Sequence, residues 1–261
     1  MLNKIYRVDA FINKVYRGNP ACVVALREWL DDEVLLKIAK KNAVAETAFF
    51  INEGKNIHLR WFTPDLEMDL CGHATLATAY VLRTVFKYSL DDIIFNTLSG
   101  SLKVSYSNNI YYLDLPARKP QSALLPKEIE LSLNIQPQEV FRSRDYMLVY
   151  RNQQEIQDIK INRFSFDRID LGCGGVIVTS IAESVDFVSR FFTPKASILE
   201  DPVTGSSHCT LIPFWSSRLN KRKLEAIQIS KRGGALTCQD SSSRVLVGGR
   251  ARLDSINEFV L

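Results

Sequence analysis

The sequence predicts an α/β (α+β) protein of two pseudo-symmetric domains, each a β-barrel-like sheet wrapped around a central buried helix. Three observations predict it. The pentapeptide RWFTP at 60–64 returns as RFFTP at 190–194, an acidic loop and an apolar run of helical length follow each copy, and strand-forming segments with a polar turn come next. The matched order of these segments, more than the pentapeptide itself, indicates an internal duplication.

The first half opens with MLNKIYRVDAFINK, which alternates apolar and polar residues as a strand does, and AVAETAFFIN at 43–52 is a second β-rich segment. After RWFTP, the run ATLATAYVLRTVF is apolar nearly all round, which predicts a buried helix. A hairpin follows, with its turn at SNN. The proline-containing stretch at 116–126 is the expected boundary, which gives domains 1–117 and 118–261.

The second half repeats this order. LGCGGVIVTS at 171–180 mirrors AVAETAFFIN, and its glycines indicate a close approach of neighbouring segments. After RFFTP, the run SHCTLIPFWSSRL predicts a second buried helix, and the basic cluster at 218–223 suits the C-terminus of that helix. The turn DSSS marks the second hairpin.

The composition limits the classes of function. Apolar residues make up 46%, and 33 basic side chains stand against 29 acidic ones, so we expect no nucleic-acid partner. No segment has the length and apolarity of a membrane span or a signal peptide, which favours a cytoplasmic protein that contacts no membrane. The five cysteines are scattered, there are three histidines, and no nucleotide-binding glycine motif occurs, so neither a metal nor a cofactor is expected.

Two glycines stand where the predicted buried helices begin. Gly72 and Gly205 occupy equivalent places after the repeated pentapeptide. A helix N-terminus presents unpaired backbone N–H groups and the positive end of the helix dipole, and glycine lets a ligand approach the backbone. Pseudo-symmetry would point both N-termini into one cleft between the domains, whose natural occupant is a small carboxylate. The simpler interpretation is that each glycine only makes a turn.

Acid–base chemistry has candidates in both halves. Glu46 stands among apolar neighbours in AVAETAFF, where a carboxyl group suits a general acid or base, although a glutamate at a strand edge that faces solvent fits the sequence equally well. His73 in CGHAT can move a proton near neutral pH. Asp201 and Ser206 in EDPVTGSSH are also good residues for capping the second helix.

Several of these segments carry a resemblance to a known family. VDAFINKVYRGNPACVVAL, AVAETAFF, RWFTPDLEMDLCGHATLA and RFFTPKASILEDPVTGSSHC together resemble the phenazine-biosynthesis (PhzF-like) family, which lies within the diaminopimelate-epimerase-like fold superfamily. The resemblance runs over essentially the whole chain. It implies two similar domains, each a sheet around a central helix. The best-understood member of that family moves a proton on a dihydro-hydroxyanthranilate without a cofactor.

The resemblance also implies roles for particular residues and an assembly. Glu46 would move the proton, while His73 and Asp201 would hold or polarise polar groups of the substrate and Ser206 would complete the catalytic set. The residues implied to bind or border the substrate carboxylate are Asn19, Gly72, Gly205 and Ser207. The resemblance further implies a homodimer that needs no metal or other cofactor.

Three functions remain open at this level. The leading one is a cofactor-independent isomerase that transfers a proton on a small carboxylate held between the two domains. The second is a cysteine-dependent epimerase or racemase with Cys71 as acid or base, although the matching place in the second half holds Thr204 and Cys209 is expected to be an ordinary buried residue. The third is a ligand-binding or protein-interaction role on an inherited enzyme scaffold.

Overall fold

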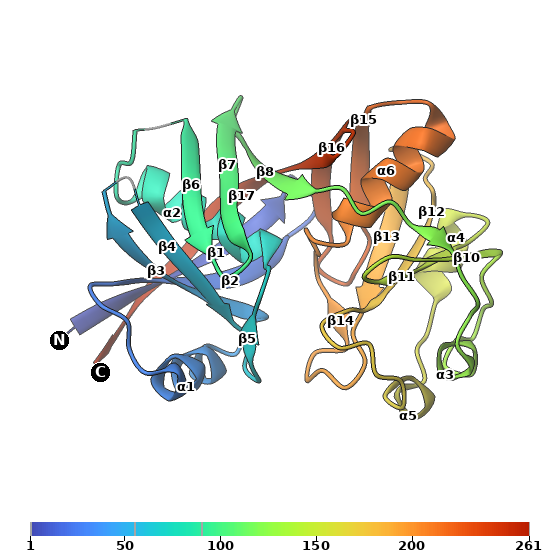
Figure 1. The fold of residues 1–261 in the computed structure, drawn as a ribbon, viewed down its shortest axis with the longest axis horizontal. Coiled ribbons are helices and arrows are strands. Elements are labelled where there is room, and N and C mark those ends of the chain that lie inside the picture. Colours follow the sequence, from blue (N-terminus) through green and yellow to red (C-terminus); the bar gives the residue numbers. More distant parts are fainter. Residues whose placement is uncertain (1, 55, 90, 261) are drawn as a thin grey trace. The chain divides into compact units, whose positions relative to one another are not determined.

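The computed structural model describes residues 2–54, 56–89 and 91–260, which divide into two compact units. One unit extends to Leu115 and takes in the chain again from Leu246, and the other is Pro116–Val245. The predicted boundary lies in the same proline-containing stretch, but the prediction left the C-terminal strand in the second domain. That strand runs antiparallel along the N-terminal strand, from Leu2 opposite Val260 to Ile12 opposite Arg250. Its backbone hydrogen bonds therefore assign it to the first unit, and Figure 1 shows the two chain ends side by side.

The first unit is a mixed barrel. Its elements are β1 (Leu2–Ile12), β2 (Asn19–Leu26), α1 (Asp32–Asn42), β3 (Glu46–Glu53), β4 (Asn56–Phe62), β5 (Glu67–Met68), α2 (Gly72–Thr84), β6 (Asp92–Thr97), β7 (Gly100–Ser107), β8 (Ile110–Pro116) and β17 (Arg244–Val260). The pairings β1–β2–β3–β4–β6–β7–β8–β17 return to β1, so eight strands close on themselves. The β2–β3 and β4–β6 pairs are parallel. Closure removes the unpaired strand edges that an open sheet would leave.

Helix α2 packs against β1, β2 and β3, and its first eight residues, Gly72 to Ala79, are all buried. Helix α1 covers the opposite face of β2 and β3, where Leu35 and Ile38 join one apolar cluster with Val24 and Phe49. Both faces of these strands are therefore buried, which explains their nearly continuous apolar sequences. The predicted turn at SNN is confirmed, since Asn108 and Asn109 have φ of 50° and 63°, the left-handed values of a tight hairpin turn.

The second unit is an open mixed sheet around α6. Its elements are β9 (Gln121–Ser122), α3 (Lys127–Glu130), β10 (Glu139–Arg142), β11 (Tyr146–Val149), α4 (Gln153–Asp158), α5 (Arg163–Phe166), β12 (Val176–Ile181), β13 (Phe187–Phe192), β14 (Glu200–Asp201), α6 (His208–Leu219), β15 (Lys223–Gln228) and β16 (Gly234–Ser241). The strand order is β9–β10–β11–β12–β13–β15–β16, and within the described residues no pairing joins its two ends. The sequence predicted a barrel-like sheet in each half, and only the first closes. The chain that follows β16 belongs to the first unit from Leu246 onward.

Helix α6 contains a proline in its interior. Pro213 has no N–H to donate to the carbonyl of Cys209, four residues earlier. The backbone N–H of Arg118 donates to that carbonyl at 2.8 Å instead, so the helix continues through the proline without an unsatisfied buried acceptor. Cys209 is fully buried, as predicted for an ordinary core residue, and burial raises the pKa of its thiol to about 11.

The repeated pentapeptide makes the same contact in both units. Arg60 on β4 donates from Nε and Nη2 to Glu67, both at 2.7 Å, and Arg190 on β13 makes the same fork to Glu200 at 2.7 and 3.0 Å. Each guanidinium also lies over the phenylalanine two residues later. The duplicated motif is thus a bidentate ion pair that fixes the loop in front of a buried helix.

Candidate active site

The strand registers show which residues of the two units correspond. Phe62 pairs with Thr47 in the first unit, and Phe192 pairs with Val176 in the second. The residues one position earlier, Glu46 and Gly175, are therefore equivalent. The five-residue spacing from Glu67 to Gly72 is the same as that from Glu200 to Gly205, so His73 corresponds to Ser206.

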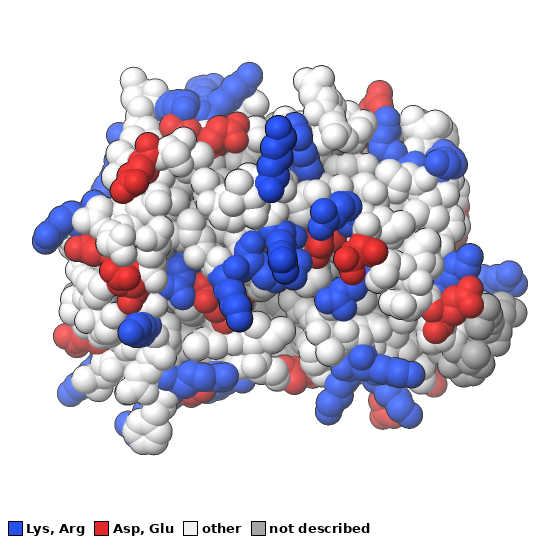
Figure 2. All heavy atoms as spheres, turned by 180° about the vertical axis from the view of Figure 1, so that it is seen from behind, with Lys and Arg blue, Asp and Glu red and all other residues white. Residues whose placement is uncertain are grey.

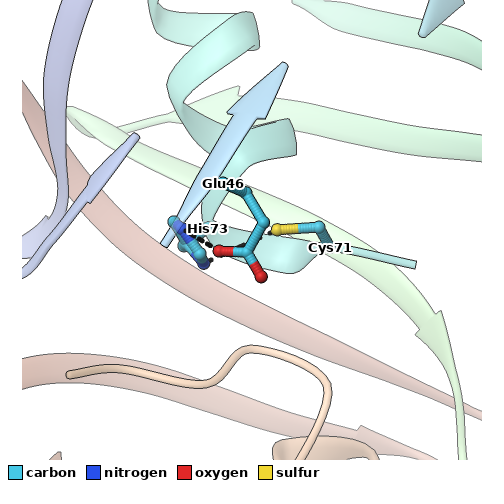
Figure 3. A group of neighbouring side chains, drawn as sticks. All are labelled: Glu46, Cys71 and His73. Atoms are coloured by element: carbon cyan, nitrogen blue, oxygen red, sulfur yellow. Dashed lines mark hydrogen bonds and ion pairs between the residues drawn. The ribbon is translucent and has the colours of Figure 1, made fainter. Parts of the chain in front are cut away.

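Glu46 begins β3 and is mostly buried. Its side chain is 15% exposed, and its Oε2 lies 3.1 Å from Nε2 of His73, outside the alignment of a good hydrogen bond (Figure 3). The sequence left open whether this glutamate faces solvent, and the structure turns it toward α2. It stands as an ion-pair partner in a largely dry environment.

His73 is the second residue of α2, and its side chain is 3% exposed. Its Nδ1 lies 3.2 Å from Nδ2 of the buried Asn19 and 3.6 Å from Sγ of Cys71. Figure 3 shows the carboxyl group of Glu46 beside the imidazole, with the sulfur of Cys71 on its other side. The first unit thus brings together the predicted residues Glu46, His73, Asn19 and Gly72.

Burial and the neighbouring groups shift the pKa of His73 in opposite directions. Burial alone would lower the pKa of His73, but neighbouring Cys71 and Glu46 outweigh it and hold the pKa well above its usual value. For Cys71, burial and then the charge of Glu46 raise the pKa of the thiol. The neighbours of His73 therefore favour a cationic imidazole.

The same three side chains are also a possible metal-binding set. Glu46, Cys71 and His73 offer one oxygen, one sulfur and one nitrogen within 4.8 Å of one another. Zinc bonds of about 2.0–2.3 Å would bring such atoms to roughly 3.5 Å from one another. Soft and borderline metals fit the donor types, but the side chains would have to draw together.

A second group of predicted residues lies in the second unit, around the loop before α6. Oδ2 of Asp201 accepts a hydrogen bond from Oγ1 of Thr204 at 2.5 Å. The buried amide of Gln228 holds both ends of this loop, since Nε2 donates to the carbonyl of Asp201 and Oε1 accepts from the backbone N–H of Thr204. The carboxylate of Asp201 is thus held at a fixed place.

Ser206 and Ser207 follow Gly205 at the start of α6. Ser206 accepts a hydrogen bond at 3.0 Å from Nη2 of Arg144, while Ser207 donates to the carbonyl of Thr204 at 2.8 Å. Arg144 in turn makes two 3.2 Å hydrogen bonds to the fully buried Asp145. These two residues and Gln228 escaped the sequence analysis, because the contacts that tie them to this loop and to Ser206 span at least 24 residues of sequence. The available signal was the charged pair RD just before a strand.

Neither central helix has a side-chain N-cap. Cys71 and Ser207 are the N-cap residues of α2 and α6, and neither makes a side-chain capping hydrogen bond to a backbone N–H, whereas Asn152 and Asn162 do cap α4 and α5. Backbone N–H groups at the N-termini of α2 and α6, beside Gly72 and Gly205, thus lack the partner that capping would supply. Such N-termini suit a bound anion.

The sequence profile of the phenazine biosynthesis-like proteins (PhzC–PhzF) matches residues 8–255. The chain belongs to this family. An uncharacterized isomerase of Pseudomonas aeruginosa is 42% identical to it over 254 residues, which cover 95% of both chains. The crystal structure of a PhzF-family protein from Enterococcus faecalis is 44% identical, covers both chains completely and superimposes with a TM-score of 0.94.

A more distant likeness concerns the fold alone. The crystal structure of a hydroxyproline epimerase from Agrobacterium vitis is 8% identical, covers 98% of this chain and 92% of its own, and has a TM-score of 0.63. These matches confirm the predicted family and its relation to the epimerase-like fold. The prediction of an isomerase is also confirmed, because full-length relatives are named isomerases. The structure is a mixed α/β protein of the PhzF fold.

Proposed function

We propose that the protein is a cofactor-independent isomerase that transfers a proton on a small carboxylate, with Glu46 as the base. One observation carries the proposal: the buried Glu46–His73 pair, 3.1 Å apart, at the uncapped N-terminus of α2. A carboxylate in a largely dry site can accept a proton from carbon, and the partner imidazole can hold or polarise a neighbouring polar group.

The proposed step is a balanced proton shift. The carboxylate of Glu46 takes the hydrogen from a carbon next to the substrate's unsaturated system, and the C–H electron pair moves into that system. The same carboxyl group returns the proton to a different carbon, so a double bond changes place and nothing is oxidised or reduced. His73, whose pKa is raised, donates to a polar group on which charge develops.

The second unit supplies groups that bind rather than transfer protons in this proposal. Asp201 and Ser206 would hold polar groups of the substrate, and the backbone N–H groups near Gly205 and Ser207 would bind its carboxylate. That the substrate lies between the two units stays a prediction, tested by a crystal soak with a panel of small carboxylates. The homodimer and the cytoplasmic location also stay predictions. In the described part of the chain no helix has the length and apolarity of a membrane span.

The cysteine-dependent alternative has less support. The raised pKa of the buried Cys71 thiol disfavours the thiolate, which is the form that would act as a base. Its counterpart is Thr204, whose hydroxyl donates to Asp201. A symmetric pair of thiols is thus missing at the two equivalent positions.

Deuterium exchange tests the proposal. Unsaturated small carboxylates are incubated with the protein in D2O, and deuterium incorporation at carbon is followed by mass spectrometry. Glu46→Gln should slow exchange by about 10²- to 10⁴-fold, because the amide cannot take a proton. Glu53→Gln, at the exposed far end of β3, is the matched control and should exchange at the wild-type rate. Undiminished exchange by Glu46→Gln would contradict the mechanism, and tight binding without exchange by the wild type would favour the ligand-binding alternative.

A further inference from the structure

Three residues of the second unit form a chain that ends at the proposed carboxylate site. Asp145 is completely buried and accepts hydrogen bonds from Nε and Nη2 of Arg144, both at 3.2 Å. The backbone N–H of Gly175 donates to the same carboxylate at 2.9 Å. Nη2 of Arg144 then reaches Oγ of Ser206 at 3.0 Å. A buried acid thus fixes a guanidinium, which fixes a hydroxyl group.

The direction of the last hydrogen bond has a chemical consequence. A guanidinium has only donors, so Ser206 must accept with an oxygen lone pair. The hydroxyl hydrogen of Ser206 is then left to donate elsewhere, and no acceptor for it lies among the described residues, although Ser206 is only 7% exposed. A buried donor without a partner is costly unless a ligand supplies the acceptor.

The hydrogen-bond donors at this place suit an anion. The guanidinium stands beside the N-terminus of α6, which has no side-chain cap. The neighbouring Ser143 hydroxyl also bonds Thr210 in the first turn of α6 at 2.8 Å, which ties the Arg144 loop to the helix. A cation, a free hydroxyl donor and the positive end of a helix dipole together suit a carboxylate.

The first unit has a neutral version of the same arrangement. Cys22 pairs with Thr47 as Tyr146 pairs with Val176, so Asn19 at the start of β2 corresponds to Ser143, next to Arg144. Asn19 contacts His73, just as Arg144 contacts the equivalent Ser206. The duplicated loops thus both support the residue after the helix glycine, one with an amide and one with a cation.

We propose that Arg144, held by Asp145, is a positioning residue that directs the Ser206 hydroxyl hydrogen to the carboxylate of the substrate. Carboxylate recognition then belongs to the second unit and proton transfer to the first. This assignment rests on the proposed function for the presence of a carboxylate, and it adds the residue that makes the site selective for one.

Benzoate and its neutral isostere benzamide are suitable probes, with dissociation constants measured by NMR titration of the full chain. The wild type should prefer benzoate. Arg144→Gln should weaken benzoate binding at least 10-fold and leave benzamide binding within 2-fold, and Arg144→Lys should restore part of the preference because it keeps the charge but not the fork. Arg142→Gln is the control: Arg142 contacts Tyr146, so this variant should bind both probes as the wild type does.

Arg144→Gln leaves the buried Asp145 with fewer hydrogen-bond donors and could therefore impair folding. The double variant Arg144→Gln/Asp145→Asn removes both charges and avoids this problem. It should show the same selective loss of benzoate binding. A benzoate preference that survives in either variant overturns the role of Arg144 alone. Equal affinity of the wild type for both probes would contradict both the carboxylate substrate of the proposed function and the role assigned to Arg144. Glu46→Gln should retain the preference, which separates recognition from proton transfer.

Discussion

Glu46 lies 3.1 Å from His73 in the first unit, and the equivalent pair in the second unit is Gly175 and Ser206. A side chain at Gly175 has no room, since a Cβ there would lie 2.4 Å from Phe191 and 2.7 Å from the carbonyl of Phe192. The duplicated scaffold therefore holds its acid in one copy only. One unit thus holds a carboxylate–imidazole pair, and the other a hydroxyl group that a guanidinium contacts.

The ion pair predicts how His73 titrates. Its pKa should lie well above 6.5 in the folded protein and fall in Glu46→Gln, because Cys71 and Glu46 together outweigh burial and the variant keeps only Cys71. The raised pKa means that this contribution to stability is complete below the unfolded pKa of about 6.5 and is lost as pH rises through the folded value. With three histidines in the chain, imidazole NMR spectra can follow the titration. An unchanged His73 pKa in Glu46→Gln would show that the pair is not coupled.

His208 predicts a loss of stability in acid. Its Nδ1 donates to the carbonyl of Thr204 at 2.9 Å, and burial lowers its pKa to about 4. Between pH 6.5 and 4 the unfolded chain binds a proton that the folded chain does not. The free energy of unfolding should therefore decrease by about 3 kcal/mol as the pH is lowered through this window. His208→Asn keeps a donor for Thr204 and does not titrate, so its unfolding free energy should depend less on pH in this window.

The control for that measurement is His58→Asn, because His58 is partly exposed at the surface of the first unit. Urea unfolding between pH 7 and 4 gives the free energies for all three proteins. His58→Asn should retain the wild-type slope. A His208→Asn slope equal to that of the wild type would contradict the assignment of acid sensitivity to this histidine.

The two forked ion pairs predict unequal effects of the same substitution. Arg190 donates to the backbone carbonyls of Ile156 and Ile159 as well as to Glu200, whereas the additional partner of Arg60 is the exposed Asp32. Arg190→Lys should therefore lower the unfolding free energy by about 1–3 kcal/mol, and Arg60→Lys by less, since buried carbonyls lose their donors only in the former. Denaturant unfolding of both variants measures the difference, and equal losses would refute it.

The cysteines separate the two enzyme mechanisms. Cys173 is exposed and the other four are buried, so iodoacetamide should alkylate Cys173 first and leave the Cys71 thiol intact in the folded protein, as peptide mass spectrometry can show. Cys71→Ser should retain most of the deuterium exchange activity, because the proposed mechanism assigns the base to Glu46. Loss of exchange in Cys71→Ser with full activity in Glu46→Gln would favour the cysteine-dependent epimerase instead.

The local features of this protein were predictable from its sequence. The helices after RWFTP and RFFTP are apolar on all sides, and such a pattern indicates burial whatever surrounds it. The equivalence of Gly72 and Gly205 followed from the spacing of the repeats. The predicted site residues fall into two groups, Asn19, Glu46, Gly72 and His73 in the first unit and Asp201, Gly205, Ser206 and Ser207 in the second, and their catalytic and binding roles stay predictions.

Other features depended on contacts between distant segments. The last strand belongs with β1 and closes only the first barrel, since backbone pairing and not composition selects the neighbour of a strand. Glu46 faces His73 rather than solvent because the β3 register directs it there. Arg144 meets Ser206 across 62 residues of sequence through the fixed place of Asp145. The repeated elements and the candidate residues could be predicted from the sequence, because they depend on local pattern. Which side chains share a charge or a hydrogen bond could not, because that depends on distance in the folded chain.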